Sequence, residues 1–241
     1  MSTLFISDLH LHEERPLVTE AFFSFLEMEA RTARSLFILG DLFDAWIGDD
    51  DDHPLSHAVA RALQKLSATT EIFFQHGNRD FLLGENYAGR CGMTLLPELF
   101  VLERESERWL LAHGDQFCTM DLAYQAFRTQ VRHPAWQTEL LSKPLAERRA
   151  IARQLREKSQ EANSLKAEDI MDVTPAEIEK ALQEHRCSKL IHGHTHRPAR
   201  HTLLLEGKVP AERIVLGDWD NTFWFLRHDN NTLQLIQQGL A

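Results

Sequence analysis

The sequence Leu36-Phe37-Ile38-Leu39-Gly40-Asp41 decides the fold of this chain. Four apolar residues closed by a glycine are typical of a strand that is buried on both faces in a parallel sheet. Gly40 allows the backbone to turn sharply, and Asp41 then projects from the carboxyl end of the strand. Open α/β sheets place their functional sites at this end, so Asp41 is the first candidate site residue.

The same layout occurs four more times along the chain. In each case an apolar stretch leads into residues with metal-binding side chains. Residues 4–7 lead to Asp8 and His10, 72–75 to Asn78, 109–112 to His113, and 189–192 to His194 and His196. Because the carboxyl ends of parallel strands meet at one edge of a sheet, we expect these side chains to converge.

Composition excludes several classes of protein. The chain has 241 residues, of which 43% are hydrophobic, as expected for one globular domain with a sizeable core. No apolar run reaches the roughly 18 residues of a membrane span. We expect no signal peptide, because Met1-Ser2-Thr3 leads directly into the first strand. The three cysteines lack CxxC spacing and indicate free thiols in a reducing cytoplasm, not a zinc–thiolate site.

Charge is distributed unevenly along the chain. The net charge of −10 argues against nucleic-acid binding. Between residues 121 and 166, however, nine lysines or arginines accompany only five acidic residues. Such a basic segment indicates an anionic ligand or an anionic membrane surface, or simply a solvated helix surface. Charge alone leaves these interpretations open.

The alternation of strands and helices is interrupted once. From 121 to 172 the sequence predicts helices and no strand, with Pro134 and Pro144 at helix starts. We interpret 121–172 as a helical cap inserted into a single domain that spans 1–241. Its apolar side chains exceed what a short connection needs, so they either cover the site or only form the small core of the insertion itself. They are Trp136, Leu140, Leu141, Leu145, Ile151 and Leu155.

Three local patterns add detail to this outline. Thr174 followed by Pro175 and Glu177 predicts a helix that begins with a capping box. Four alternating segments at 199–205, 213–216, 222–227 and 232–237 predict one antiparallel meander. The four aspartates at 49–52 are interpreted as a solvated turn before the next helix, not as a cation site.

The candidate metal ligands all carry oxygen or imidazole donors. This set favours Mn²⁺, Fe²⁺ or Zn²⁺ over metals that prefer thiolate. Seven ligands exceed what one ion needs and suit two ions that share a carboxylate. Spacing of two residues, as in Asp8-Leu9-His10, aims both side chains to one side of an extended segment. The seven are Asp8, His10, Asp41, Asn78, His113, His194 and His196.

Five short motifs occur in order: D-x-H at 8–10, G-D at 40–41, G-N-x-[DE] at 77–80, H-G-D at 113–115 and G-H-x-H at 193–196. In these motifs the chain resembles the calcineurin-like metallophosphoesterases. The resemblance implies an α/β fold, the distorted αββα sandwich of that family, here with a helical cap insertion. It also implies two metal ions with Asp41 bridging. One ion would be held by Asp8, His10, Asp41 and His196, and the other by Asp41, Asn78, His113 and His194.

Arg79 departs from the usual pattern of this family. Members that cleave phosphomonoesters usually carry a histidine there as general acid, within G-N-H-[DE]. Arginine is a poor proton donor but a good bidentate phosphate clamp. A phosphate leaving group needs little protonation, so Arg79 favours cleavage of a diphosphate. The sequence contains no G-x-S-x-G elbow and no P-loop. The nucleophile implied by the resemblance is a water activated by the two metal ions.

Further segments resemble one group within the family, which acts in lipid A biosynthesis; they include 40–50, 76–84, 93–97, 124–128, 161–164, 170–173 and 191–198. The resemblance implies hydrolysis of UDP-2,3-diacylglucosamine to UMP and 2,3-diacylglucosamine 1-phosphate (lipid X), with Mn²⁺ and with attack of water on the α-phosphorus. It implies catalytic roles for Asp41, Asn78, Arg79 and His194. It implies substrate contacts at Asn78, Arg79, Asp121, Ser159, Asn163, Lys166 and His194.

The same resemblance implies a location and a set of partners. It places the protein in the cytoplasm, peripherally bound to the inner membrane, with a UDP-linked diacylated glucosamine as its substrate. Neither a nucleic acid nor an obligate protein partner is expected. Ser159, Asn163 and Lys166 are spaced so that one face of a helix presents all three, which suits a wall for a sugar and a phosphate.

Two other functions remain open from the sequence. A soluble hydrolase of nucleotides or dinucleoside polyphosphates would share the metal ligands but would not need an apolar, basic cap. A scaffold like the retromer subunit of this fold would have lost ligands, whereas all seven are present here.

Overall fold

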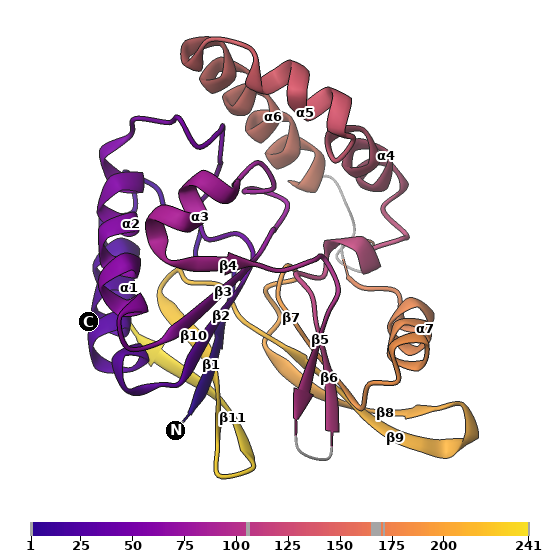
Figure 1. Cartoon of the computed structure of the whole chain (residues 1–241). Helices are drawn as coiled ribbons and strands as arrows, with labels where there is room; N and C mark the ends of the chain where they lie inside the picture. Colours follow the sequence, from indigo (N-terminus) through magenta and orange to yellow (C-terminus); the bar gives the residue numbers. More distant parts are fainter. Residues whose placement is uncertain (1, 105–106, 165–169, 171, 241) are drawn as a thin grey trace.

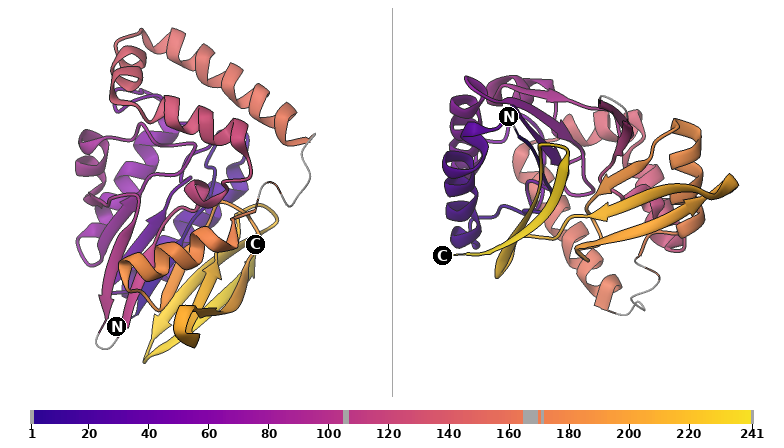
Figure 2. Two further views of the ribbon diagram at one scale, coloured as in Figure 1. Left: turned by 90° about the vertical axis from the view of Figure 1, so that its right-hand side faces the viewer. Right: turned by 90° about the horizontal axis from the view of Figure 1, so that it is seen from below.

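Two β-sheets lie face to face, and helices cover their outer faces (Figure 1). The computed structural model describes residues 2–104, 107–164, 170 and 172–240, without the side chains of 158–164. Seen from below in Figure 2, α1 and α2 flank one sheet and α7 flanks the other. This arrangement is the layered α-β-β-α order that the family resemblance implies.

The first sheet has six strands in the order β11-β10-β1-β2-β3-β4. Its strands β1 to β4 run parallel and are connected by helices α1, α2 and α3, as in repeated βαβ units. The strands are β1 (Thr3–Ile6), β2 (Ser35–Leu39), β3 (Glu71–Gln75), β4 (Met93–Leu95), β10 (Thr222–Asp229) and β11 (Thr232–Gly239). The helices are α1 (Pro16–Met28), α2 (Pro54–Ser67) and α3 (Glu85–Cys91), with a short 3-10 turn η1 (Ala30–Thr32) after α1.

The second sheet has five strands in the order β5-β6-β7-β9-β8. Strands β6, β7 and β9 run parallel, while β5 and β8 form antiparallel edges. The strands are β5 (Phe100–Arg104), β6 (Glu107–Leu111), β7 (Lys189–His192), β8 (Ala199–Leu205) and β9 (Val209–Val215). Helix α7 (Pro175–His185) covers the outer face, and η2 (Asp115–Phe117) and η4 (Glu206–Lys208) are short 3-10 turns.

Alternation of side chains along each strand divides the interior into three apolar layers. In β1, Phe5 packs between the two sheets, whereas Leu4 and Ile6 pack beneath the helices of the first sheet. In β7, Ile191 faces the same central layer and Leu190 faces α7. Successive residues of a strand point to opposite faces, so these continuous apolar runs are buried on both sides.

The four C-terminal strands do not form one meander, and this expectation was wrong. Strands β8 and β9 form a hairpin in the second sheet, whereas β10 and β11 form a hairpin on the edge of β1 in the first sheet. The connection between them contains Trp219, which is fully buried against Phe25 and Phe223. An alternating pattern identifies a strand but does not identify the sheet that it joins.

Helices α4 (Leu122–Val131), α5 (Pro134–Leu141) and α6 (Leu145–Ser164), here called the cap helices, lie above the carboxyl edge of the sheets (Figures 1 and 2). Helix α6 is held to the loop after β2 by ion pairs. Arg148 donates to the carbonyl oxygen of Ile47 at 2.7 Å and pairs with Asp50, and Arg149 pairs with Asp51 at 2.7 Å.

The aspartates at 49–52 do form a turn before α2, with Asp50 and Asp52 mostly exposed, but the expectation missed that this turn also binds α6. Asp50 and Asp51 are joined to α6, and Asp52 also accepts a hydrogen bond from Arg149. Asp49 accepts hydrogen bonds from the N–H groups of Gly84 and Tyr87 and fixes the start of α3. Partners 97 or 98 residues apart along the chain hold this loop, so no local pattern could reveal its role.

We predict that Arg148→Met lowers the free energy of unfolding by about 2 kcal/mol, because the carbonyl of Ile47 loses its buried donor. The ion pair itself contributes little, since the Asp50 side chain is 62% exposed. Urea unfolding would measure the change, with Gln154→Met on the exposed face of α6 as the control. Equal stability of both variants and the wild type would contradict this account of how α6 is held.

Candidate active site

The loops that follow the strands carry five candidate ligands in left-handed backbone conformations. Their φ angles are 58° at Asp8, 48° at His10, 54° at Asp41, 68° at His194 and 54° at His196. Residues with a Cβ rarely adopt this conformation, so each position stores strain that the surrounding structure must hold. Such strain concentrates at functional sites, and here it follows β1, β2 and β7.

Two glycines allow these loops to approach one another. A Cβ added at Gly40, whose φ is 86°, would lie 2.6 Å from Gly77 and 2.6 Å from the Nδ1 atom of His113. A Cβ added at Gly77 would lie 2.0 Å from the Oδ1 atom of Asp41. The glycines of the G-D and G-N-x-[DE] motifs are therefore required by packing at the site.

One group of donor atoms is formed by Asp8, His10 and His196. The Nε2 atoms of His10 and His196 face each other at 3.3 Å. The Nε2 atom of His196 also lies 3.3 Å from the Oδ1 atom of Asp8. These three side chains thus converge on one point from the loops after β1 and β7.

A second group of donor atoms contains Asp8, Asp41 and His113. Next to it, the Oδ1 atom of Asn78 lies 2.9 Å from ring nitrogens of both His113 and His194. The Oδ2 atom of Asp41 is 3.6 Å from the Nε2 atom of His113 and 3.9 Å from that of His10. Asp41 therefore lies between the histidines of the two groups, and all seven candidate ligands meet in one cluster.

Burial and mutual contact shift the pKa values in this cluster. Burial raises the pKa of Asp41 to about 7, opposed by His113 and reinforced by Asp80 and Asp8. Burial would also raise the pKa of Asp8, but the hydrogen bond with His196 and the nearby imidazoles hold it well below its usual range. Burial lowers the pKa of His194 to about 4.

The donor chemistry of this cluster fits a divalent transition metal. Two fully buried carboxylates, one amide oxygen and imidazole nitrogens lie within hydrogen-bonding or near-contact distance of one another. Carboxylate and imidazole are the ligands of Mn²⁺, Fe²⁺ and Zn²⁺ in proteins. A cation would relieve the crowding of these donor atoms and stabilise the ionised form of Asp41.

Asp80 was not among the candidate site residues, although the structure makes it central to the loops. Its side chain is fully buried and accepts hydrogen bonds from the N–H groups of Gly77 and Leu42 at 2.8 Å and of Asp41 at 3.3 Å. It therefore joins the loop after β2 to the loop after β3. The motif G-N-x-[DE] contains this residue and was the available signal.

Asp115 of the H-G-D motif anchors the first cap helix. Its buried carboxylate accepts hydrogen bonds from the Tyr124 hydroxyl at 2.6 Å and from the Nε atom of Arg128 at 2.8 Å. Arg132 donates to the carbonyl oxygen of Gly77 at 2.8 Å, and the Tyr124 ring stacks on His194 at 5.9 Å. Helix α4 thus contacts three loops, which carry the four candidate ligands Asn78, His113, His194 and His196.

These contacts also account for much of the basic segment. Six of its cations already pair with carboxylates of the protein; they are Arg128, Arg132, Lys143, Arg148, Arg149 and Arg156. Arg153 forms no ion pair with any residue that the structure describes. The Lys158 side chain and Lys166 lie outside the described part of the chain.

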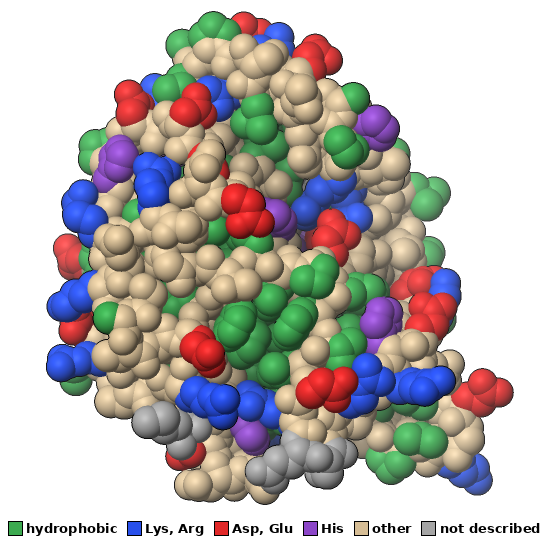
Figure 3. All heavy atoms as spheres, viewed as in Figure 1, with side chains coloured by type: hydrophobic (Ala, Val, Ile, Leu, Met, Phe, Trp, Pro, Cys, Tyr) green, Lys and Arg blue, Asp and Glu red, His purple; other side chains and the backbone are tan. Residues whose placement is uncertain are grey.

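A cavity of about 280 Å³ opens beside Asn78 and Arg79, beneath the cap helices. Four of the apolar side chains that the sequence assigned to the cap line it: Trp136, Leu140, Ile151 and Leu155. Phe81 and Phe127 add aromatic surface. Figure 3 shows apolar side chains between the cap helices and the loops below them, with basic side chains close by.

The structure places only some of the residues that were predicted to contact the substrate. The N–H group of Arg79 donates to the Oδ1 atom of Asp41 at 2.8 Å, and its side chain lines the cavity without an ion pair to any described residue. Asp121 is buried and caps α4 by accepting from the N–H of Tyr124 at 3.0 Å. The side chains of Ser159 and Asn163, and all of Lys166, lie outside the described residues.

The chain matches the family model described as calcineurin-like phosphoesterase over residues 1–198. It is 59% identical to a UDP-2,3-diacylglucosamine hydrolase of Cellvibrio japonicus over 94% of both chains. It is 52% identical to the enzyme of the same name from Marinobacter nauticus, over 100% of this chain and 99% of the relative. A solved phosphoesterase from E. coli aligns with all of both chains at a TM-score of 0.49 and 17% identity, too low to bear on function.

The chain therefore belongs to the calcineurin-like phosphoesterases. Its place within that family is with the UDP-2,3-diacylglucosamine hydrolases, to which the 59% and 52% identical relatives belong. It is accordingly a hydrolase, and its family and cluster of donor side chains support the use of a divalent metal. None of the described helices is long and apolar enough to cross a membrane.

We predict that Asp41→Ala removes most bound metal and lowers kcat about a thousandfold, because this carboxylate lies between the two groups of donor atoms. Metal content per chain by mass spectrometry, together with turnover, would measure the effect. Asp41→Asn, which can retain the hydrogen bond from Arg79, is the matched control for packing. His10→Ala should weaken mainly one ion, and normal metal content in Asp41→Ala would overturn the central role of Asp41.

Proposed function

We propose that the enzyme hydrolyses the diphosphate of UDP-2,3-diacylglucosamine to UMP and 2,3-diacylglucosamine 1-phosphate, in lipid A biosynthesis. The observation that carries this proposal is the apolar cavity that opens beside Asn78 and Arg79, next to the cluster of metal-binding side chains. The names of the relatives supply the identity of the substrate. A hydrolase of soluble dinucleoside polyphosphates binds no lipid and would not need this apolar cavity.

The proposed cofactor is Mn²⁺, with two ions per chain. Asp8, His10, Asp41 and His196 would hold one ion, and Asp41, Asn78, His113 and His194 would hold the other. The position of Asp41 between the two groups of donor atoms supports its assignment as the shared ligand. When bound, the ions supply a water of lowered pKa and neutralise charge on the phosphate oxygens.

Arg79 is the proposed phosphate clamp. Its backbone is fixed by the hydrogen bond to Asp41, and its guanidinium lies at the cavity without an acidic partner among the described residues. Two parallel N–H groups can therefore bind the oxygens of the diphosphate as its charge increases during bond cleavage. Asn78 and His194, whose Oδ1 and Nδ1 atoms lie 2.9 Å apart, are proposed to orient the phosphate.

The segment 121–172 is proposed to act as a cap within a single domain that spans 1–241. Its helices cover the cavity and place aromatic and aliphatic side chains where acyl chains are expected. Each buried methylene contributes about 0.8 kcal/mol, so a few of them would dominate recognition of the lipid. Asp121, Ser159, Asn163 and Lys166 are proposed to contact the glucosamine and its phosphate.

Peripheral binding to the cytoplasmic face of the inner membrane is part of the same proposal. Met120 and Leu122 flank Asp121, and they are 65% and 77% exposed. Exposed apolar side chains beside the proposed sugar contact suit extraction of a lipid from a bilayer.

Co-sedimentation of the wild type and of the Met120→Ser, Leu122→Ser double variant with anionic vesicles would test membrane binding by these side chains. Equal binding of both proteins would contradict it.

We predict that hydrolysis of UDP-2,3-diacylglucosamine in ¹⁸O-labelled water, with Mn²⁺ present, places the label in UMP. Attack on the α-phosphorus leaves the new oxygen on the nucleotide and makes the sugar phosphate the leaving group. Mass spectrometry of both products would locate the label. A dinucleoside polyphosphate serves as the control substrate. Its faster hydrolysis would favour the other function, and label in the sugar phosphate would reverse the point of attack.

We predict that Arg79→Ala lowers kcat by about a hundredfold while metal content stays unchanged, because only the transition-state contact is lost. Arg79→Lys keeps the charge without the planar pair of donors and is the matched control. Arg79→His restores the residue that is usual in the family. Full activity in Arg79→His would show that the position supplies a proton instead of a clamp.

A further inference from the structure

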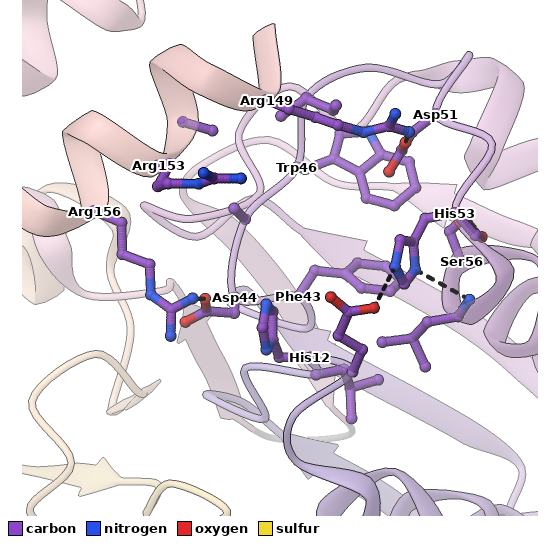
Figure 4. Close-up of a pocket in the computed structure, with 16 residues that line it drawn as sticks. His12, Phe43, Asp44, Trp46, Asp51, His53, Ser56, Arg149, Arg153 and Arg156 are labelled. Atoms are coloured by element: carbon purple, nitrogen blue, oxygen red, sulfur yellow. Dashed lines mark hydrogen bonds and ion pairs between the residues drawn. The ribbon is translucent and has the colours of Figure 1, made fainter. Parts of the chain in front are cut away.

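A second cavity, of about 240 Å³, lies between α6, the start of α2 and the loop after β1 (Figure 4). Residues 44–47 line both this cavity and the apolar cavity described above, as do Ala152 and Arg156. The two cavities therefore share one wall. Neither the predicted substrate contacts nor the proposed acyl-chain cavity accounts for the second one.

This nucleoside cavity, as we call it for the reasons below, is lined in part by the loops that carry two proposed metal ligands. His12 lines it and lies two residues after His10, and Phe43 lines it two residues after Asp41. The loops that carry them run side by side, with a hydrogen bond of 2.9 Å from the N–H of Leu11 to Leu42. Asn78 and Arg79 line the other cavity only. Apart from the shared residues 44–47, the loop after β1 thus lines this cavity and the loop after β3 lines the other.

Most of the charged side chains around the nucleoside cavity are paired with one another. Arg149 pairs with Asp51 at 2.7 Å, and Arg156 pairs with Asp44 at 2.8 Å. His53 and Glu13 form a third contact, at 3.1 Å. The remaining cation is Arg153, which is exposed and has no acidic partner among the residues that the structure describes. Figure 4 shows its side chain extending from α6 over the cavity.

We propose that this cavity binds the nucleoside end of the substrate, a uracil base with its ribose. The inference rests on the proposed function, which requires the diphosphate at the metal cluster to carry a lipid on one side and a nucleoside on the other. The rings of Phe43 and Trp46 supply apolar surface for a flat base. Arg153 donates N–H groups to the carbonyl oxygens of uracil, and Glu13 or Asp51 accepts from the ribose hydroxyls.

The lining of this cavity suits an acyl chain less well than that of the other. Glu13, Asp51 and Arg153 line it where Phe81, Phe127, Trp136 and Leu140 line the other, and an acyl chain cannot replace the hydration of charged groups. A polyanion would need several free cations, whereas Arg153 alone is uncommitted among the described lining residues. A nucleoside is neutral, so it needs no further cations, and its polar groups can bond to the charged side chains. Its single phosphate would lie at the metal cluster.

The test is calorimetric titration of the Mn²⁺-loaded enzyme with UMP, with uridine and with 2,3-diacylglucosamine 1-phosphate. Arg153→Ala is expected to raise the Kd of UMP and of uridine about tenfold and to leave the Kd of the lipid product unchanged. Arg153→Lys should lie between Arg153→Ala and the wild type. Leu55→Trp, which fills the cavity, should weaken UMP binding as well. Gln154→Ala, at the exposed neighbouring position of α6, is the control.

The outcomes separate this inference from the proposed function. Unchanged UMP and uridine affinity in both Arg153→Ala and Leu55→Trp would overturn the inference, even if the wild type cleaves the lipid nucleotide. Weaker binding of the lipid product instead of UMP would assign the cavity to an acyl chain and also overturn it. Loss of UMP affinity in both variants of an enzyme that does not cleave UDP-2,3-diacylglucosamine would uphold the nucleoside site and reject only the substrate.

Discussion

The rest of the site depends on one buried carboxylate, that of Asp80, and the backbone N–H groups that donate to it. These hydrogen bonds join the loop of Asp41 to the loop of Asn78. Gly40 and Gly77 bring the two loops into close contact. Without these hydrogen bonds, the buried N–H groups at that contact would have no acceptor. The left-handed conformation of Asp41 is strained, and the same contacts supply the energy that holds it.

The sequence predicted those features of the structure that are determined by residues close together along the chain. Apolar runs closed by a glycine or a polar residue located β1, β2, β3, β6 and β7, and the motifs after them located all seven side chains of the cluster. The start of α7 was also predicted, but the Thr174 hydroxyl bonds to Thr119 at 2.7 Å and forms no capping box. A hydroxyl with two available partners cannot be assigned from sequence spacing.

Features determined by distant partners could not be predicted in this way. The pairing of Asp50 with Arg148 and the division of the last four strands between two sheets depend on the assembled fold. The cavities depend on it too, because their volume is set by how α6 packs against residues 44–47. The charge of the basic segment was counted correctly, but counting could not show that most of these cations already have partners.

Helix α6 forms a wall of both cavities, and this shared wall has a consequence for the order of events in the catalytic cycle. If lipid and nucleoside occupy the two cavities, one outward movement of α6 uncovers both products. Neither product then has to leave first, in contrast to enzymes whose two subsites open separately. Product-inhibition kinetics would report random release in this case.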